Sequence, residues 1–255
     1  MQAYLQFATE LARESGALIM EYFGRHGQVE AKADATPVTV ADRGAEALMR
    51  RRIAARFPQH QVLGEEEGLS GPQGARHRWV LDPIDGTKSF IHGVPLFGTL
   101  IALLEEDTPV LGAIHLPALG DLLLGARGEP TTLNGEPVRI SDTPTLEQAT
   151  VLYTSSSELF RQGYGRTLQV LGERVRLVRN WGDCYGHFLV ATGRADIMFD
   201  PVMNLWDIAA LKPCVEGAGG RLTDRAGQGE RLGDSALSSN GHLHEAFLRL
   251  LAETA

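Results

Sequence analysis

The segment Trp79-Val-Leu-Asp82-Pro-Ile-Asp85-Gly-Thr87 decides how the rest of the chain is interpreted. An apolar run precedes Asp82, and Gly86 follows the second acid, Asp85. A strand that enters such a turn places both carboxylates at one point, with the Ile84 carbonyl between them, and these are the hard oxygen ligands that Mg²⁺ prefers. The glycine lets a ligand approach the backbone closely. The segment therefore predicts a magnesium site at the end of a strand.

Two other interpretations of this segment are a calcium-binding EF-hand loop and a plain turn. An EF-hand loop that began at Asp82 would need oxygen ligands at its third and fifth positions and a glutamate at its twelfth. Ile84, Gly86 and Gly93 occupy those positions, which excludes the loop. Asp-Pro and Asp-Gly pairs are common in turns that bind nothing, so the segment alone does not decide between a site and a turn.

Two further acidic segments favour a site. Gly64-Glu65-Glu66-Glu67-Gly68 follows a strand-like run, and Asn204-Leu-Trp206-Asp207 precedes a helical pattern. Acidic residues at three element ends, far apart in the sequence, are what a site with more than one metal ion needs. Taken singly, Asp207 could only stabilise a helix N-terminus, and the glutamates could form a solvated loop.

The composition limits the class of protein. The chain has 255 residues, with 24 Lys and Arg against 32 Asp and Glu, and its formal net charge is −8. An acidic chain repels polyanions, and Arg50-Arg51-Arg52 is its one dense basic run. The scarcity of such runs argues against nucleic acid or a membrane surface as a partner. No apolar run reaches the roughly 20 residues that cross a bilayer. With two isolated cysteines and no signal-peptide pattern, we expect a cytoplasmic protein.

Hydrophobic periodicity predicts an α/β protein. Helical spacing occurs from the N-terminus to Gly24 and again over 42–57, with a polar hinge over 32–37. A flexible loop is expected over 68–74 and a turn at Asn134-Gly135. Strand-like runs lie at 61–63, 78–81, 98–104, 110–116, 121–126, 149–154, 175–178, 195–199, 220–223 and 237–239. Further helices are expected at 157–171, 183–193, 207–218 and 242–252.

Three motifs in this order, GEE at 64–66, DPIDGT at 82–87 and WDIAA at 206–210, resemble those of the inositol monophosphatase family of Mg²⁺-dependent phosphomonoesterases. The resemblance covers nearly the whole chain, and includes Lys32 and Asp34, which could close a loop over the metals or belong to the hinge. It implies a layered α/β/α/β/α sandwich, direct attack of a metal-activated water on phosphorus, and a homodimer. We expect one compact unit, with an N-terminal half over 1–145 and a C-terminal half over 146–255.

The resemblance also implies the metal ligands. The first of two Mg²⁺ ions, which holds the attacking water, would take Glu65, Asp82 and the Ile84 carbonyl. The second, beside the leaving oxygen, would take Asp82, Asp85 and Asp207. Two divalent ions about 3.5–4 Å apart can stabilise both the attacking and the departing oxygen of an in-line displacement.

By the same resemblance, Asp42 and Thr87 orient the water and help to deprotonate it, and Glu66 supports the ligands or a third, weaker ion. The backbone N–H groups of Gly86 and Thr87 would take phosphate oxygens, as helix N-termini commonly do. Without the other motifs, Asp42 could simply cap its helix. No Ser-His or Cys-His nucleophile pair is evident in the motifs, so a covalent phosphoenzyme is not expected.

Two segments resemble the histidinol-phosphate phosphatase branch of the family. Lys88 follows the DGT triplet, and the stretch 180–186 replaces the small residues that an inositol pocket usually shows. Histidinol phosphate carries an imidazole and an ammonium group, so its pocket should present carboxylates and a polar or aromatic partner. The candidate substrate-binding residues are Gly86, Thr87, Lys88, Asp183, Tyr185, Asp200 and Asn204.

The leading hypothesis is therefore Mg²⁺-dependent hydrolysis of a small phosphate monoester, with L-histidinol phosphate first and inositol 1-phosphate second. Fructose and nucleotide bisphosphates are weaker options. An inositol ring has no cation for Asp183, which would then be only a helix N-cap. A phosphate-ester sensor without turnover is the non-enzymatic alternative, and the presence of Asp42 and Thr87 argues against it. His92 and His187 are interpreted as ordinary polar residues.

Overall fold

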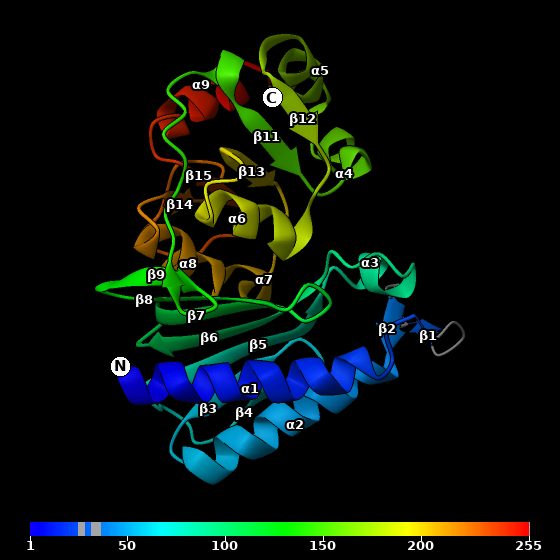
Figure 1. Ribbon diagram of the computed structural model, residues 1–255, viewed down its shortest axis with the longest axis vertical. Coiled ribbons are helices and arrows are strands. Elements are labelled where there is room, and N and C mark those ends of the chain that lie inside the picture. Colours follow the sequence, from blue (N-terminus) through cyan, green and yellow to red (C-terminus); the bar gives the residue numbers. More distant parts are fainter. Residues whose placement is uncertain (25–28, 32–36, 255) are drawn as a thin grey trace.

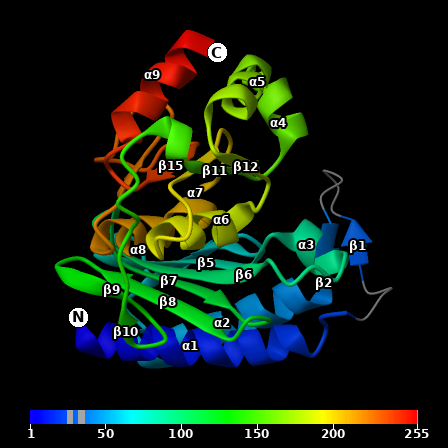
Figure 2. The same cartoon turned by 45° about the horizontal axis from the view of Figure 1, so that its top comes forward.

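The computed structural model describes residues 1–24, 29–31 and 37–254. These residues form five layers, α/β/α/β/α, around two sheets (Figure 1), which confirms the expected sandwich. The two ends of the chain lie in opposite outer layers (Figure 2). Lys32 and Asp34, and with them most of the predicted hinge, lie outside the described residues. No described helix is both long enough and apolar enough to cross a membrane.

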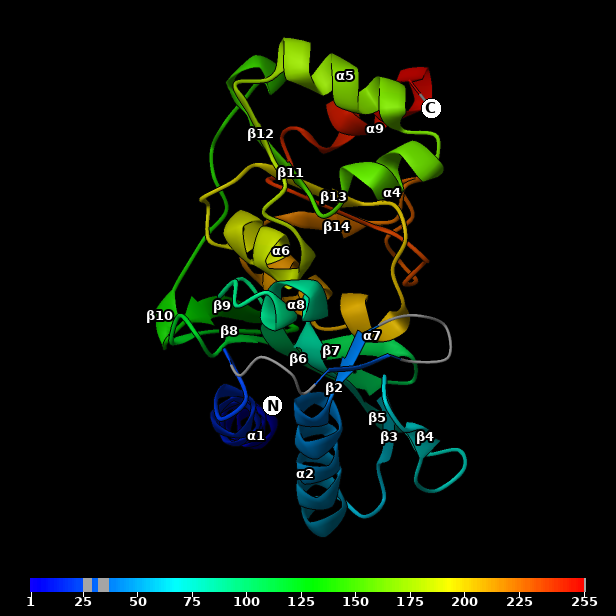
Figure 3. The same cartoon turned by 90° about the vertical axis from the view of Figure 1, so that its right-hand side faces the viewer.

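The first layer consists of two long helices that lie side by side on one face of the first sheet (Figure 3). They are α1 (Gln2–Met20) and α2 (Val40–Arg56). Their buried apolar stripes meet the ring of Trp79 from the sheet, and burial of such a stripe is what holds helices of this kind in place. A two-stranded hairpin precedes α2 and consists of β1 (Val29–Ala31) and β2 (Pro37–Thr39).

The second layer is an eight-stranded sheet in the order β10-β9-β8-β7-β6-β5-β3-β4. Every neighbouring pair is antiparallel except β3 with β5. Its central strands are covered on both faces, which explains their continuous apolar runs. The strands are β3 (Gln61–Gly64), β4 (Gly68–Ser70), β5 (His77–Asp85), β6 (Gly98–Glu105), β7 (Thr108–Leu116), β8 (Asp121–Ala126), β9 (Glu129–Leu133) and β10 (Glu136–Pro137).

The third layer lies between the two sheets and brings C-terminal residues onto the first sheet. It contains α6 (Asp183–Ala191), α7 (Leu205–Ile208) and α8 (Leu211–Gly217). The helix α8 approaches the sheet so closely that a Cβ atom at Gly112 of β7 would lie 2.0 Å from the Ala210 carbonyl oxygen. Only glycine permits this approach of two backbones. The segment that carries Asp207 is thereby fixed against the first sheet.

The fourth and fifth layers complete the C-terminal part. The second sheet has the order β12-β11-β13-β15-β14, with parallel pairing of β11 to β12 and β13 and antiparallel pairing elsewhere. Its strands are β11 (Thr150–Tyr153), β12 (Leu177–Arg179), β13 (Ile197–Asp200), β14 (Arg221–Thr223) and β15 (Ala236–Ser239). The outer helices are α4 (Ser156–Arg161), α5 (Gly165–Arg174) and α9 (His244–Thr254). Two short helices, α3 (Thr87–Ile91) and the 3₁₀ turn η1 (Leu146–Gln148), lie in connections.

Most of the expected elements form within a few residues of their predicted bounds, and three expectations are wrong. The helix expected over 157–171 is two helices, α4 and α5, because Gly163 between them has a left-handed φ of 89°. The helix expected over 207–218 is also two, because Pro213 has no N–H for the Ala209 carbonyl, and the chain restarts at Leu211. The loop expected over 68–74 instead begins as an edge strand, β4, which pairs with β3.

The turn predicted at Asn134-Gly135 is confirmed. Asn134 has a φ of 51° and Gly135 a φ of 91°, and they join β9 to β10, two short strands that the apolar pattern does not predict. The two sheets lie within residues 61–137 and 150–239, and one core cluster contains residues of both. The division of the chain at residue 145 stays a prediction.

Candidate active site

A bulge in β5 brings two of the predicted metal ligands onto one side of the sheet. Residues an odd number apart on a regular strand point to opposite faces. In β5, Asp82 pairs with Leu100 and Asp85 pairs with Gly98, so that β5 has one residue more than β6 between the two pairs. A β-bulge of this kind redirects the side chains that follow it. The carboxylates of Asp82 and Asp85 can therefore face the same space.

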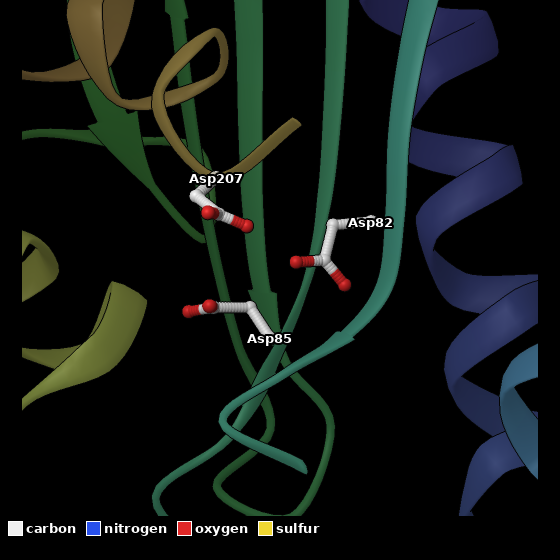
Figure 4. Close-up of side chains that lie close together, drawn as sticks. All are labelled: Asp82, Asp85 and Asp207. Atoms are coloured by element: carbon white, nitrogen blue, oxygen red, sulfur yellow. The ribbon is translucent and has the colours of Figure 1, made fainter. Parts of the chain in front are cut away.

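Asp207 joins them from α7, as Figure 4 shows. Carboxylate oxygens of Asp82, Asp85 and Asp207 all lie within 4.8 Å of one another. The Asp207 Oδ2 atom also accepts hydrogen bonds from the backbone N–H of Asn204 at 2.6 Å and from its Nδ2 at 3.3 Å. Asp207 is thus a helix N-terminal residue and a member of the acidic cluster at once.

The three carboxylates repel one another in a buried place. Burial, and then the charges of Asp85 and Glu65, raise the pKa of Asp82 well above its usual value. Burial and the charge of Asp183 raise the pKa of Asp85 in the same way, and burial raises that of Asp207. The Oδ1 atom of Asp82 is buried without a hydrogen-bond partner among the described residues. A divalent cation fits this arrangement, since it would compensate the charges and use the unpaired oxygen.

Glu65 and Asp42 approach the cluster from two other elements. The parallel register of β3 with β5 sets Gly64 beside Leu81, so the next residues along the two strands, Glu65 and Asp82, leave the sheet at the same end. Asp42 lies in the first turn of α2 and is buried, at 2% exposure. The charges of both Glu65 and Asp42 act on Asp82 and raise its pKa.

The short helix α3 begins directly after the aspartates. Gly86 precedes it with a left-handed φ of 82°, and Thr87 is its first residue. The Thr87 hydroxyl donates a hydrogen bond to the Ile84 carbonyl oxygen at 2.9 Å. Lys88, which follows, is exposed and lines the adjoining cavities. The structure thus brings the DGT triplet, its lysine and the predicted carbonyl ligand to one turn.

Glu66 has a different environment from Glu65. Its side chain is only 5% exposed, and its Oε2 atom lies 3.7 Å from the Nε atom of Arg43. Its backbone N–H donates to a carboxylate oxygen of Glu46 at 2.8 Å. The role that the resemblance implies for Glu66 stays a prediction.

Two cavities adjoin the aspartate cluster, of about 420 Å³ and about 480 Å³. The first, which we call the acidic cavity, has five carboxylate side chains and two basic ones, Lys88 and Arg161, in its wall. Its lining residues are Asp85, Lys88, Thr154, Ser155, Glu158, Leu159, Arg161, Asp183, Phe199, Asp200, Pro201, Val202, Met203, Asn204 and Asp207. The second cavity contains Glu65, Gly86 and Thr87 and shares Lys88, Thr154, Ser155 and Asp183 with the first.

Asp183 lies where the two cavities meet. It is the first residue of α6 rather than its N-cap, which is Gly182, and it has a left-handed φ of 52° that is unusual for a residue with a side chain. Its backbone N–H donates to the Thr154 hydroxyl at 2.7 Å. Burial, and then the charge of Asp200, raise the pKa of Asp183 to about 7. Such a strained, charged residue in a cavity wall is typical of a functional site.

Asp200, at the end of β13, lies next to a buried histidine. Its Oδ1 atom accepts the Thr154 N–H at 3.3 Å, and its Oδ2 atom lies 3.4 Å from the Nε2 atom of His187. His187 is fully buried, and its Nδ1 atom is 2.7 Å from the Ser238 hydroxyl. The interpretation of His187 as an ordinary polar residue did not anticipate its contacts with Asp200 and Ser238. Nothing in the sequence predicts that β13 and β15 lie next to this histidine.

Three other candidates have mixed positions. Asn204 lines the acidic cavity but is engaged with Asp207. The partly buried Tyr185 ring packs against Phe188, with their centroids 6.1 Å apart, so its role in substrate binding stays a prediction. Glu158 of α4 lines the acidic cavity and was not among the residues singled out from the sequence, because it lies in no motif.

Comparison with known proteins assigns the family. A family model described as the inositol monophosphatase family matches residues 1–254. The chain belongs to the inositol monophosphatase family. As a member of this family of metal-dependent phosphatases, it is a phosphoric monoester hydrolase, as the motifs predict. Its acidic cluster could bind the metal.

The relatives of this inositol monophosphatase family member include proteins named histidinol-phosphatase. The protein from Chlorobaculum parvum is 46% identical over 92% of this chain and 92% of its own length. The protein from Mycobacterium tuberculosis is 38% identical, with 97% of each chain covered. A Thermotoga maritima relative named fructose-1,6-bisphosphatase/inositol-1-monophosphatase is 32% identical, over 98% of this chain and 96% of that one.

Solved structures of the family share the fold of this chain. The IMPase of Thermotoga maritima superposes with a TM-score of 0.90 at 30% identity, over 99% of this chain and 98% of that one. The extragenic suppressor protein suhB of Bartonella henselae gives a TM-score of 0.93 at 27% identity, over 99% and 100% of the two chains. The predicted fold class is therefore confirmed for the whole chain.

Proposed function

We propose that this protein hydrolyses L-histidinol phosphate to L-histidinol and phosphate with the help of Mg²⁺. The observation that carries the proposal is the acidic cavity, whose wall includes Asp85 and Asp207 of the aspartate cluster and also Asp183 and Asp200. A substrate bound there would place its phosphate at the aspartate cluster and its cationic groups next to the carboxylates of Asp183 and Asp200. The relatives named histidinol-phosphatase, among them those at 46% and 38% identity, support the same substrate.

The metal would be held by Glu65, Asp82, Asp85, Asp207 and the Ile84 carbonyl. Two Mg²⁺ ions, or three with a weaker one near Glu66, would stabilise negative charge on the attacking and leaving oxygens of the phosphate ester. The buried unpaired oxygen of Asp82 and the raised pKa values of the aspartates support this ligand set.

Asp42 and Thr87 would orient the attacking water. The Thr87 hydroxyl donates its hydrogen bond to the Ile84 carbonyl, so a lone pair on the Thr87 oxygen remains to accept a hydrogen bond from a water molecule. The Asp42 carboxylate would take up the proton that the water loses. The backbone N–H groups of Gly86 and Thr87, at the start of α3, and the ammonium of Lys88 would bind phosphate oxygens.

Asp183 and Asp200 would bind the cationic groups of histidinol. Thr154 contacts both residues, because its hydroxyl accepts from the Asp183 N–H and its N–H donates to Asp200. The buried His187 lies beside the Asp200 carboxylate, with its Nε2 atom 3.4 Å from Asp200 Oδ2. Tyr185 and Asn204 are proposed to contribute contacts to the imidazole ring.

A phosphate-release assay with Mg²⁺ tests the substrate. Histidinol phosphate, inositol 1-phosphate, fructose 1,6-bisphosphate and a nucleoside bisphosphate are compared by kcat/KM, and histidinol phosphate should rank first. The relative named fructose-1,6-bisphosphatase/inositol-1-monophosphatase makes inositol 1-phosphate the second candidate. Preference for any other ester would refute the proposed substrate, and Mg²⁺ binding without hydrolysis of any ester would favour the sensor.

Two further proposals concern the state of the protein. We propose a homodimer, which sedimentation of the purified protein can test. We propose a cytoplasmic location, which the two buried free cysteines, Cys184 and Cys214, support because unpaired cysteines are common in reducing compartments.

A further inference from the structure

The turn that carries Glu65 is hydrogen-bonded to a buried carboxylate on α2. Glu46 is fully buried, and its two oxygens accept the backbone N–H groups of Glu66 at 2.8 Å and Glu67 at 3.0 Å. These are the two residues that follow Glu65 in the turn between β3 and β4. Backbone hydrogen bonds to a charged acceptor are stronger than those to a neutral one. The main chain of the turn is therefore held directly by Glu46.

Arg50, one helical turn after Glu46, binds both Glu46 and the start of β4. Its Nε atom donates to Glu46 Oε1 at 2.7 Å, and the rest of the guanidinium donates to the Gly68 carbonyl at 2.5 Å and the Ser70 hydroxyl at 2.7 Å. The planar guanidinium can serve several acceptors at fixed angles, which lysine cannot do. The pair thus binds both ends of the turn: its N–H groups through Glu46 and the start of β4 through Arg50.

Gly64 leaves the room that this contact needs. A Cβ atom at position 64 would lie 2.3 Å from the Oε1 atom of Glu46, so any side chain there would displace the carboxylate. Gly64 has no left-handed φ, so the close approach is what requires glycine. The glycine of the GEE motif is thereby explained by a residue that no motif contains.

The same helix also carries Asp42. Residues four apart lie on one face of a helix, so Asp42, Glu46 and Arg50 form a row along α2. The row begins at the aspartate cluster, where the Asp42 charge acts on Asp82, and ends at the β3–β4 turn. One rigid helix face therefore sets Asp42 and the turn of Glu65 relative to each other.

We propose that Glu46 and Arg50 are positioning residues of the metal site, which hold the turn at 64–68 so that Glu65 reaches the ion bound by Asp82. This inference rests on the proposed function, because it takes Glu65 as a ligand. The competing explanation is that the pair only stabilises the hairpin. The two explanations differ in what they predict for metal affinity of the folded protein.

The test is calorimetric titration of the metal-free protein with MgCl₂, for the wild type and for Glu46→Gln. The glutamine amide has one acceptor oxygen, whereas the Glu46 carboxylate offers one oxygen to each of the N–H groups of Glu66 and Glu67. The turn should therefore be held less firmly, and we expect the Mg²⁺ Kd to rise by about 10-fold or more, as for other residues that orient metal ligands. The Mg²⁺ concentration for half-maximal activity should rise in parallel, while kcat at saturating Mg²⁺ stays within about threefold of the wild type. Arg52→Gln is the matched control, since Arg52 lies on the same helix and, among the described residues, forms surface ion pairs with Glu10 and Glu14.

A Glu46→Gln protein that loses thermal stability but keeps the wild-type Mg²⁺ Kd within twofold would overturn the inference. Arg50→Lys decides the matter if Glu46→Gln does not fold, because lysine keeps the charge beside Glu46 and loses the bonds to the Gly68 carbonyl and Ser70. We expect a weaker Kd for this variant too, and an unchanged Kd would again overturn the inference. Absence of any Mg²⁺ binding by the wild type would instead refute the proposed ligand set, and the inference with it.

Discussion

Asp82 is the most enclosed of the clustered aspartates, at 2% exposure, and faces acidic neighbours on three elements. An asparagine at this position keeps the shape of the side chain and removes one negative charge. Loss of a residue that only supports metal ligands typically costs about 10–100-fold. Asp82 would be a ligand itself, so we expect Asp82→Asn to lose more than about 100-fold in kcat/KM. In EDTA the variant should melt at a temperature equal to or above that of the wild type, because repulsion in the cluster falls.

Phosphate release and thermal unfolding in EDTA check the two halves of that prediction. Near-normal activity would contradict the proposed role of Asp82 in holding both ions. A lower melting temperature without metal would show that Asp82 contributes to the fold in a way that its unpaired oxygen does not suggest.

The raised pKa values of single carboxyl groups also predict how metal binding depends on pH. A carboxyl whose pKa is higher in the folded than in the unfolded protein stabilises the fold at low pH, and that contribution is lost as the pH rises through the folded pKa. For Asp183 the window runs from its ordinary value of 3.8 to about 7, and Asp82, Asp85 and Asp207 shift in the same direction. Mg²⁺ competes with protons for such groups.

We therefore expect the rise in melting temperature caused by a fixed Mg²⁺ concentration to be larger at pH 8 than at pH 5.5. The difference between melting with Mg²⁺ and melting in EDTA is measured at each pH, which cancels the opposite contributions of His60 and His244, whose pKa values are lowered to about 4 chiefly by burial. A Mg²⁺ effect that shrinks as the pH rises would show that the aspartates are not the ligands.

Asp183 separates substrate recognition from phosphate chemistry. We expect Asp183→Ala to lower kcat/KM for histidinol phosphate more than for an aryl phosphate, which has no cationic group to meet the carboxylate. Steady-state kinetics on the two esters measure the difference. Equal losses on both esters would show that Asp183 does not bind the cationic groups and has only a structural role at the start of α6, where it follows the N-cap Gly182.

Among the elements, α8 sets the position of Asp207 through its close approach to β7. A Cβ atom at Gly112 would lie 2.0 Å from the Ala210 carbonyl oxygen and 3.0 Å from the Ala210 Cα atom, so it would meet backbone rather than a flexible side chain. We expect Gly112→Ala to cost about 1–3 kcal/mol of stability, the usual range for an overpacked core. It should also weaken Mg²⁺ binding, because α7 and Asp207 precede α8 directly.

Denaturant unfolding and Mg²⁺ titration measure the two effects. Gly172→Ala is the control, because Gly172 lies in α5 with no atom within 4 Å of its Cβ position, and alanine is the better helix former by about 1 kcal/mol. Equal stability of the two variants would contradict the assigned role of Gly112.

The sequence predicts elements best where local signals agree. The apolar runs of the central strands and the Asn134-Gly135 turn predict their own structures. The edge strand β4 has no apolar alternation, since it is held by backbone pairing with β3, and β-propensity depends strongly on such context. The acidic cluster could be expected from its motifs, but Glu46, Arg50 and His187 act through contacts that only the folded chain brings together.

The molecule as a whole joins its two sheets through helices rather than through a flexible link. The core cluster between the sheets combines residues of β6 and β7 with residues of α6, α8 and β13. The aspartate cluster lies in the same region, with Asp82 and Asp85 from the first sheet and Asp207 from the C-terminal part of the chain. Metal binding should therefore affect the stability of the whole molecule and not of one part.

We expect Mg²⁺ at 100 times its Kd to stabilise the protein by about 2.7 kcal/mol, as mass action requires for a ligand that binds only the folded state. Unfolding in denaturant with Mg²⁺ and with EDTA measures this. One cooperative transition that shifts as a unit is the expected outcome, and a shift of only one of two transitions would show that the parts unfold separately.

The meeting of Asp82 with Asp207 has a consequence for the chain as a polymer. The two cysteines of this protein are free, so no covalent bond closes a long loop in it. An ion shared by residues 82 and 207 would close a loop of more than a hundred residues, and closing long loops restricts an unfolding chain more than closing short ones. The catalytic metal would then act as a reversible staple, opened by chelation where a disulfide would need a reductant.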